Sequence, residues 1–181
     1  KKGHGAQSAI FLLVDAVGRA TPKQPKETSA RFAKALAPKR SKGYRAIATA
    51  EWIRAVLDYD DPTLMEAVAL YDGYSREHLD TAGSGRTANR VARALLARGR
   101  IPEAIRLSNA LSLARPQDSE TIRTTFDIGV ASFAEGETLN ARSAFAAVLR
   151  AWPLRLTDGA VTWEEKCLYW LARVDLLERK P

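Results

Sequence analysis

The sequence predicts an all-α protein, built from antiparallel helical hairpins that stack side by side as a short solenoid with additional N-terminal helices. Two observations carry this prediction. Apolar residues recur at helical spacing along most of the chain, and one pattern of small and large residues occurs twice, 37 residues apart. The copies share a glycine, an alanine and a proline, which are Gly99, Ala104 and Pro116 in the first and Gly136, Ala141 and Pro153 in the second.

The spacing of these residues has a physical cause. Glycine closes a helix in the left-handed conformation without a Cβ penalty, and a small residue five positions later lets the returning helix approach closely. Proline then stops the second helix, because it lacks the N–H and clashes with the preceding turn. A hairpin of this kind cannot bury its apolar side alone, so repetition favours stacking.

The pattern resembles the tetratricopeptide repeat (TPR) family over about residues 85–178. The second copy fits with Gly129, Gly136, Ala141, Phe145 and Pro153. The first copy fits less well, because Ser108 stands where the family has an aromatic residue. Neither copy has the family's early tryptophan, since Ala88 stands there in the first copy and Thr125 in the second. An ordinary helical bundle is the alternative interpretation. The resemblance implies a groove, lined by the first helix of each hairpin, that receives a peptide or a partner protein.

Three segments are expected along the chain. Residues 1–43 form a basic helical segment with helices at about 8–20 and 28–36, residues 44–84 form a helix pair that resembles a degenerate repeat, and residues 85–181 hold the repeats and a C-terminal capping helix. Thr162 and Glu165 have the spacing of a capping box that starts the last helix. Helical periodicity predicts buried faces that contain Ile47, Ala50, Ile53 and Leu57, then Leu64, Met65, Val68 and Tyr71, and finally Leu168, Leu171, Val174 and Leu177.

Residues that could support catalysis are few. The chain has two histidines, His4 and His78, and one cysteine, Cys167, which lies among apolar residues and is expected to be a buried, inert thiol. Gly83, Gly85 and Ala88 have the bare spacing of a dinucleotide fingerprint, but a helix is expected where that motif needs a strand. The sequence predicts a protein that is not an enzyme and has no cofactor and no metal. Its apolar runs are too short to span a membrane.

The leading functional hypothesis is a protein-protein interaction scaffold. Matching positions to the TPR family places the peptide-binding groove at Arg86, Asn89, Arg93, Leu96, Arg123, Phe126, Val130 and Phe133. Asn89 and Arg93 lie one helical turn apart, so with Arg86 they are expected to bind a carboxylate or an acidic peptide. Solvated side chains with no ligand are the alternative interpretation.

A competing hypothesis is nucleic-acid or anionic-surface binding by the N-terminal region. Residues 1–50 hold eleven of the 28 Lys and Arg residues but only two of the 21 acidic ones. The proposed anion site is Lys39, Arg40, Lys42 and Arg45. Self-association is a third hypothesis, with Trp152, Trp163 and Trp170 as contacts. The chain starts at Lys1, which leaves room for a leader, an anchor or further domains upstream, so the sequence assigns no localisation.

Overall fold

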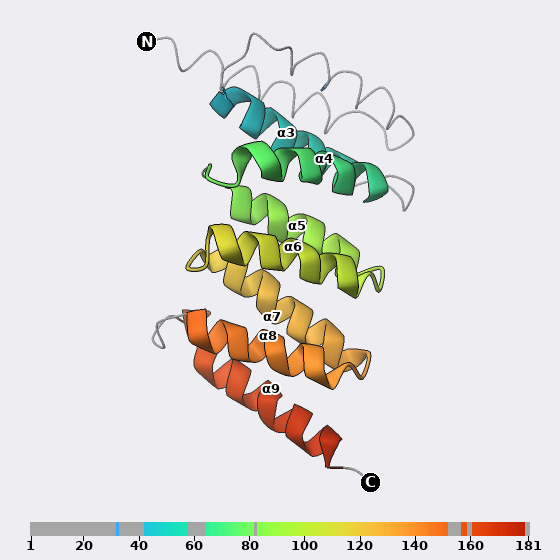
Figure 1. The fold of residues 1–181 in the computed structure, drawn as a ribbon, viewed down its shortest axis with the longest axis vertical. Coiled ribbons are helices and arrows are strands. Elements are labelled where there is room, and N and C mark those ends of the chain that lie inside the picture. Colours follow the sequence, from blue (N-terminus) through green and yellow to red (C-terminus); the bar gives the residue numbers. More distant parts are fainter. Residues whose placement is uncertain are drawn as a thin grey trace. The chain divides into compact units, whose positions relative to one another are not determined.

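The computed structural model describes residue 32 and residues 42–57, 64–81, 83–151, 157–158 and 161–179. This part of the chain is almost entirely helical, which confirms the predicted fold class of stacked helical hairpins (Figure 1). Its helices are α3 (Lys42–Leu57), α4 (Leu64–His78), α5 (Ser84–Leu96), α6 (Ile101–Ala114), α7 (Ser119–Ala134), α8 (Thr138–Ala151) and α9 (Trp163–Glu178). The helices predicted at 8–20 and 28–36, together with Trp152, lie outside the described residues, apart from Phe32.

The chain divides into two compact units, Lys1–Thr87 and Ala88–Pro181. The division falls inside α5, three residues after the boundary expected between residues 84 and 85. In the first unit α3 packs against α4, and the residues buried there include Ala48, Ile53, Val56, Leu64, Ala67 and Tyr71.

Two predictions about the first unit's core were wrong. Ile47 is 42% exposed and Met65 is 51% exposed. Ala46 and Ala48, on either side of Ile47, are buried instead. A methyl side chain can be enclosed where helices lie close together, so helix α3 turns its alanines inward and Ile47 outward.

In the second unit, consecutive helices from α6 to α9 pack against one another in chain order (Figure 1). The turns between α5 and α6 and between α7 and α8 are closed in the same way. Gly99 and Gly136 have φ angles of 68° and 78°. In the first turn, the N–H of Arg100 donates to the carbonyl of Leu95 at 2.9 Å and the N–H of Gly99 donates to Leu96 at 3.0 Å.

The second turn repeats these two bonds 37 residues later. The N–H of Glu137 donates to Ser132 at 2.8 Å, and the N–H of Gly136 donates to Phe133 at 3.1 Å. This pair of bonds is a Schellman motif, in which the left-handed glycine lets the last helical carbonyls find donors. The prediction that Gly99 and Gly136 end their helices is therefore confirmed.

The helices of the second hairpin approach each other closely at Gly129. A Cβ atom added there would lie 2.7 Å from Cε1 of Phe145, whose side chain is fully buried. Only a residue without a side chain leaves room for this ring. The matching positions of the first hairpin hold Ala92 and Ser108, which are 1% and 4% exposed.

The last helix, α9, is preceded by a short antiparallel pair of strands, β1 (Thr157–Asp158) and β2 (Val161–Thr162), which the sequence analysis missed. The predicted capping box is confirmed, because the Thr162 hydroxyl accepts from the Glu165 N–H and the Glu165 carboxylate accepts from the Thr162 N–H. No helix in the described part of the chain is long and apolar enough to cross a membrane.

The buried face of α9 differs from the predicted one. Trp163, Cys167 and Val174 are buried, whereas Leu168 is 52% exposed and Leu177 is 38% exposed. Val174 is buried and Leu171 packs against the core, as predicted. The inward face begins at Trp163, so Leu168 points outward instead. The core that α9 completes contains Ile122, Ala141, Phe145, Val148, Trp163, Cys167 and Val174.

Candidate interaction surfaces

The predicted groove residue Asn89 is part of the interior and cannot line a groove. Its side chain is 6% exposed, and its amide donates to the Thr124 hydroxyl at 2.9 Å, which joins α5 to α7. That hydroxyl in turn donates to the Glu120 carbonyl at 2.7 Å. A buried amide needs such partners. The prediction for Asn89 was wrong, because the sequence did not show that a second helix lies against this face of α5.

The predicted aromatic groove residues are covered by α9. Phe126 contacts the Trp163 ring with centroids 5.2 Å apart, and Phe133 contacts the Trp170 ring at the same separation. Both phenylalanines and Val130 are partly buried against the core of the second unit. These side chains therefore hold α7 to α9, and little of their surface is available to a ligand.

The remaining predicted groove residues divide into three cases. Arg93 and Arg123 are exposed on α5 and α7, and Leu96 is half-buried. Arg86 is exposed but precedes Ala88, where the second unit begins. The arginines are therefore the part of the predicted groove that the structure leaves at the surface.

Further cations lie on the same side of the second unit. The Arg93 guanidinium lies 3.7 Å from the Asp127 carboxylate, which ties α5 to α7 on this side. Arg173 lies over the Phe133 ring, 5.5 Å from its centroid, and Lys166 lies 5.0 Å from the centroid of Trp163. Arg90 is exposed and lies three residues before Arg93 on α5, so the two side chains are neighbours on the helix surface. We call these cations the basic face, and it consists of Arg90, Arg93, Arg123, Lys166 and Arg173.

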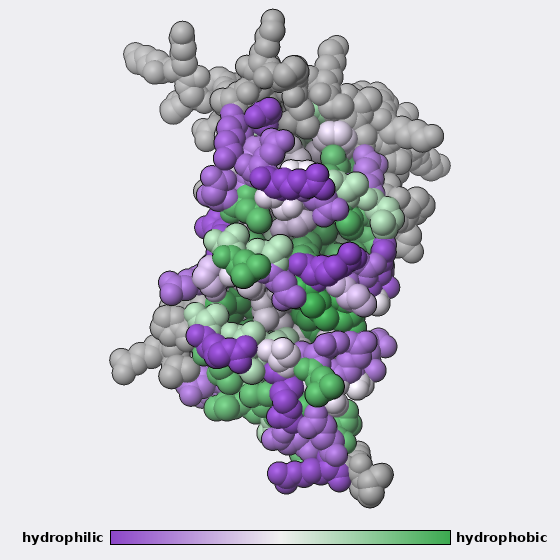
Figure 2. All heavy atoms as spheres, viewed as in Figure 1, coloured by the Kyte–Doolittle hydropathy of each residue, from purple (hydrophilic) through white to green (hydrophobic). Residues whose placement is uncertain are grey.

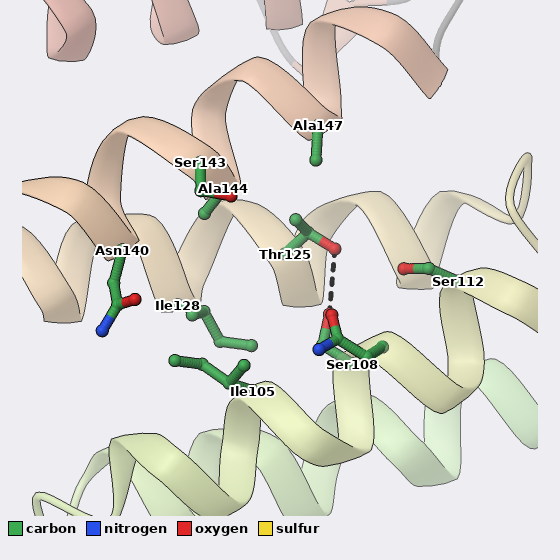
Figure 3. A pocket seen from close by; sticks show the side chains of 10 residues that line it. Ile105, Ser108, Ser112, Thr125, Ile128, Asn140, Ser143, Ala144 and Ala147 are labelled. Carbon is green, nitrogen blue, oxygen red and sulfur yellow. Dashed lines mark hydrogen bonds between the residues drawn. The ribbon is translucent and has the colours of Figure 1, made fainter.

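A hollow lies on the other side of the second unit, between α6, α7 and α8 (Figure 3). Its volume is about 210 Å³. Its lining is uncharged and consists of Ile105, Ser108, Asn109, Ser112, Thr125, Ile128, Asn140, Ser143, Ala144 and Ala147. The hydroxyls of Ser108 and Thr125 lie 3.0 Å apart, and the dashed line in Figure 3 marks the hydrogen bond between them. The sequence analysis did not predict this hollow, although the serine in place of an aromatic at position 108 is a signal for it.

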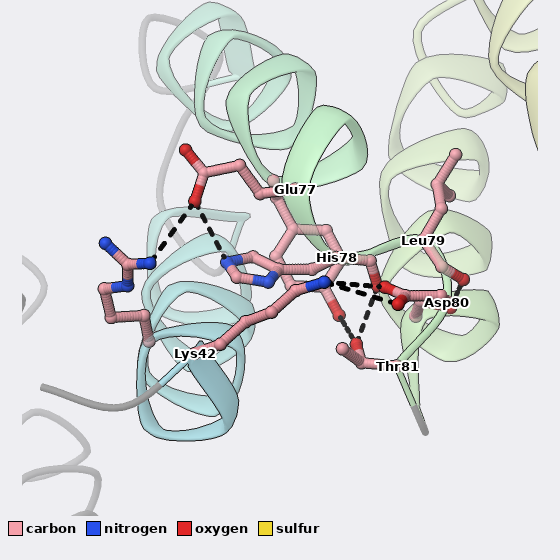
Figure 4. A network of polar contacts seen from close by, with 9 residues as sticks. Lys42, Glu77, His78, Leu79, Asp80 and Thr81 are labelled. Atoms are coloured by element: carbon pink, nitrogen blue, oxygen red, sulfur yellow. Dashed lines mark hydrogen bonds and ion pairs between the residues drawn. The ribbon is translucent and has the colours of Figure 1, made fainter.

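The described cations of the predicted anion site are paired with carboxylates (Figure 4). The Lys42 ammonium lies 3.3 Å from Asp80, and its hydrogen bond to that carboxylate lowers the pKa of Asp80. Arg45 lies 4.0 Å from Glu77. This neutralisation weakens the anion-site interpretation for Lys42 and Arg45, while Lys39 and Arg40 lie outside the described residues.

His78 lies in the same network and is almost fully buried. Its Nε2 atom is 3.7 Å from Glu77, and its ring lies 5.3 Å from that of Tyr74. Burial lowers the pKa of His78, because a charged imidazole would lose its hydration. No set of side chains that could hold a metal ion is found among the described residues.

The one cysteine, Cys167, is fully buried, as predicted. Burial raises the pKa of its thiol to about 11, because a thiolate would be poorly solvated in this core. A thiol of this kind is a weak nucleophile at neutral pH.

Comparisons with known proteins identify the fold. The structure is similar to the solved structure of BtubC (BKLC) from P. vanneervenii, with a TM-score of 0.61 over 93% of this chain and 71% of that chain. The two sequences are 12% identical, so the similarity concerns the fold alone. No protein-family model and no curated protein sequence matches the chain. The fold therefore places this chain in the class of all-α proteins built from stacked helical hairpins.

Proposed function

We propose that this protein is a non-enzymatic interaction scaffold, and that its basic face binds an acidic peptide segment of a partner protein. The observation that carries the proposal is the gathering of Arg90, Arg93, Arg123, Lys166 and Arg173 along α5, α7 and α9. Arg93 of this set lies 3.7 Å from the carboxylate of Asp127. A surface of one predominant charge attracts segments of the opposite charge and speeds their association.

Ion pairing elsewhere in the second unit supports this assignment. Arg115 lies 2.9 Å from Asp118, and Arg142 contacts both Asp175 and Glu178. Those arginines have close carboxylate partners, whereas the ion pair of Arg93 is longer, at 3.7 Å, and its side chain is 67% exposed. Arg93 can therefore still offer its planar donors to a ligand's carboxylates.

We also propose that the two hairpins are TPR units. The close packing of Gly129 on Phe145 and the paired glycine turns support this interpretation, because both use residues of the family pattern. The family's groove would then coincide with the basic face along α5 and α7. Nucleic-acid binding by the N-terminal region stays a prediction, and Lys39 and Arg40 of its anion site lie outside the described part of the chain.

A binding titration with the whole chain tests the proposed function. The probe is a fluorescein-labelled peptide of consecutive glutamates, followed by fluorescence anisotropy at low and physiological salt. We expect Arg90→Gln with Arg93→Gln to weaken binding about tenfold or more, since charge-assisted hydrogen bonds contribute about 1.5–3 kcal/mol each.

The matched control is Arg106→Gln with Arg150→Gln, which removes two exposed arginines from α6 and α8. This control removes the same charge from helices that do not form the basic face. Equal weakening by both double variants would show a non-specific charge effect and contradict the proposal. Failure of the unsubstituted chain to bind the peptide at low salt would also contradict it.

A further inference from the structure

The outward side of α9 carries a continuous set of exposed residues. We call it the outer α9 face, and it consists of Glu165, Leu168, Tyr169, Ala172, Leu176 and Arg179. Leu168, Tyr169 and Leu176 are 52%, 56% and 64% exposed. Figure 2 shows hydrophobic side chains at the surface in the region of α9, next to hydrophilic ones. Single exposed leucines are ordinary, but these lie within one or two turns of each other on one face.

The outer α9 face also differs from the corresponding parts of α5 and α7. Ala92 is 1% exposed in α5, and Gly129 is buried against Phe145 in α7. Aligning Leu171 and Ala172 with Val91 and Ala92 places Ala172 at the equivalent position of α9. Ala172 is exposed. The small residue that lets another helix approach is therefore present in α9, but this position is open.

The residues around Ala172 are arranged symmetrically. Leu168 and Leu176 lie four residues before and after it, and Glu165 and Arg179 lie seven residues before and after it. These offsets of three and four residues keep all five side chains on one face of the helix. Two copies of α9 that run antiparallel and cross at Ala172 would place Leu168 of each against Leu176 of the other.

The charges fit the same arrangement. Glu165 of each copy would face Arg179 of the other, so both ends of the contact would carry an opposite-charge pair. The glutamate is available for this contact because it is exposed while it caps its own helix, and a carboxylate can accept several hydrogen bonds. A face with an acidic end, an apolar middle and a basic end is complementary to an antiparallel copy of itself.

We propose that α9 joins two copies of this chain in an antiparallel, two-fold symmetric contact centred on Ala172. Such an interface is isologous, because each copy uses the same surface. Its length is that of α9, which has 16 residues and spans about 24 Å. A contact between two single helices lies at the low end of specific interfaces, below about 1,200 Å², so the dimer is reversible at micromolar concentrations.

Sedimentation velocity of the whole chain over a range of micromolar concentrations is the first test. We expect the mass to rise from monomer to dimer, and Leu176→Glu to shift the association to at least tenfold higher concentration. The control is Leu113→Glu, the same change at a residue that is 88% exposed on α6. A constant monomer mass over this concentration range would overturn the proposal.

A disulfide cross-link tests the geometry separately. Ala172→Cys places two thiols beside the two-fold axis, where mild oxidation should join the copies into a covalent dimer on a non-reducing gel. The native Cys167 is fully buried and gives little background. Leu113→Cys is the control, and we expect it to cross-link much more slowly. Equal cross-linking of both variants, or a dimer that Leu176→Glu leaves unchanged, would overturn the assignment of this face.

The outer α9 face contains no residue of the basic face. The two faces meet where the Arg173 guanidinium donates to the Tyr169 hydroxyl at 2.9 Å. Because neither test changes these two residues, the proposed dimer and the proposed peptide binding can still fail separately.

Discussion

The hairpins α5–α6 and α7–α8 share a backbone plan but fill it with different side chains. Both close with a left-handed glycine and the same two hydrogen bonds. The second hairpin packs the Phe145 ring against Gly129, whereas the first has Ser108 and Ala92 at the matching positions. In the second hairpin a glycine leaves room for a large ring. In the first hairpin an alanine is combined with a small serine side chain.

The contacts that join each hairpin to the next part of the stack also use different side chains. Between α5 and α7 the contacts are polar, with Asn89 on Thr124 and Arg93 on Asp127. Between α7 and α9 they are aromatic, with Phe126 on Trp163. Asn89 and Phe126 occupy matching positions, 37 residues apart. The comparison teaches that glycine turns and small residues are enough to set the hairpin, while the chemistry that joins hairpins can change.

The largest expected effect comes from removing the aromatic ring of the second hairpin. Phe145→Ala should destabilise the second unit by about 3–5 kcal/mol, because the ring is fully buried and its loss leaves a cavity. Ser108→Ala at the matching position should reduce stability by about 1 kcal/mol or less, mainly through the lost hydroxyl contact with Thr125. Urea unfolding monitored by tryptophan fluorescence measures both. Similar losses would show that the two hairpins do not differ as described.

A smaller effect is expected from adding a methyl group at the close helix contact. Gly129→Ala should destabilise by about 1–3 kcal/mol, because its Cβ would lie 2.7 Å from the Phe145 ring. In an unhindered helix the same change would stabilise by about 1 kcal/mol. The sign of the change in unfolding free energy is therefore decisive, and a stabilised Gly129→Ala variant would show that the ring can move aside.

The smallest expected effect is a coupling between the two matching positions of the first hairpin. Ser108→Phe alone should be destabilising, because a ring there would meet the methyl group of Ala92. Combining it with Ala92→Gly recreates the pair found in the second hairpin. A double-mutant cycle in urea should then give a favourable coupling of about 0.5–3 kcal/mol. Additive effects would show that these positions do not contact each other as Gly129 and Phe145 do.

Features that depend on a few neighbouring residues could be predicted from the sequence. The turns at Gly99 and Gly136 and the capping box of Thr162 and Glu165 follow from local backbone chemistry, so their motifs are sufficient evidence. The buried state of Cys167 was also predictable from the apolar residues around it. The strand pair before α9 gave no such signal, because each strand has only two residues.

The candidate surfaces could be predicted only in part. The sequence placed Arg93 and Arg123 at the surface of the repeats, but it treated Asn89 and Phe126 as exposed members of the same groove. Polarity alone does not show that Asn89 is buried, because its partner Thr124 is 35 residues away. The outer α9 face was missed for a related reason, since Leu168 looks like a core residue until the helix is oriented.

The sequence by itself determined the helical class, the period of 37 residues and the residues at which the hairpins turn. These depend on glycine, proline and capping side chains acting on the backbone next to them. The tertiary structure alone decided which side of each helix is buried. Successive residues of a helix point about 100° apart, so a small rotation against the neighbouring helices exchanges buried and exposed side chains.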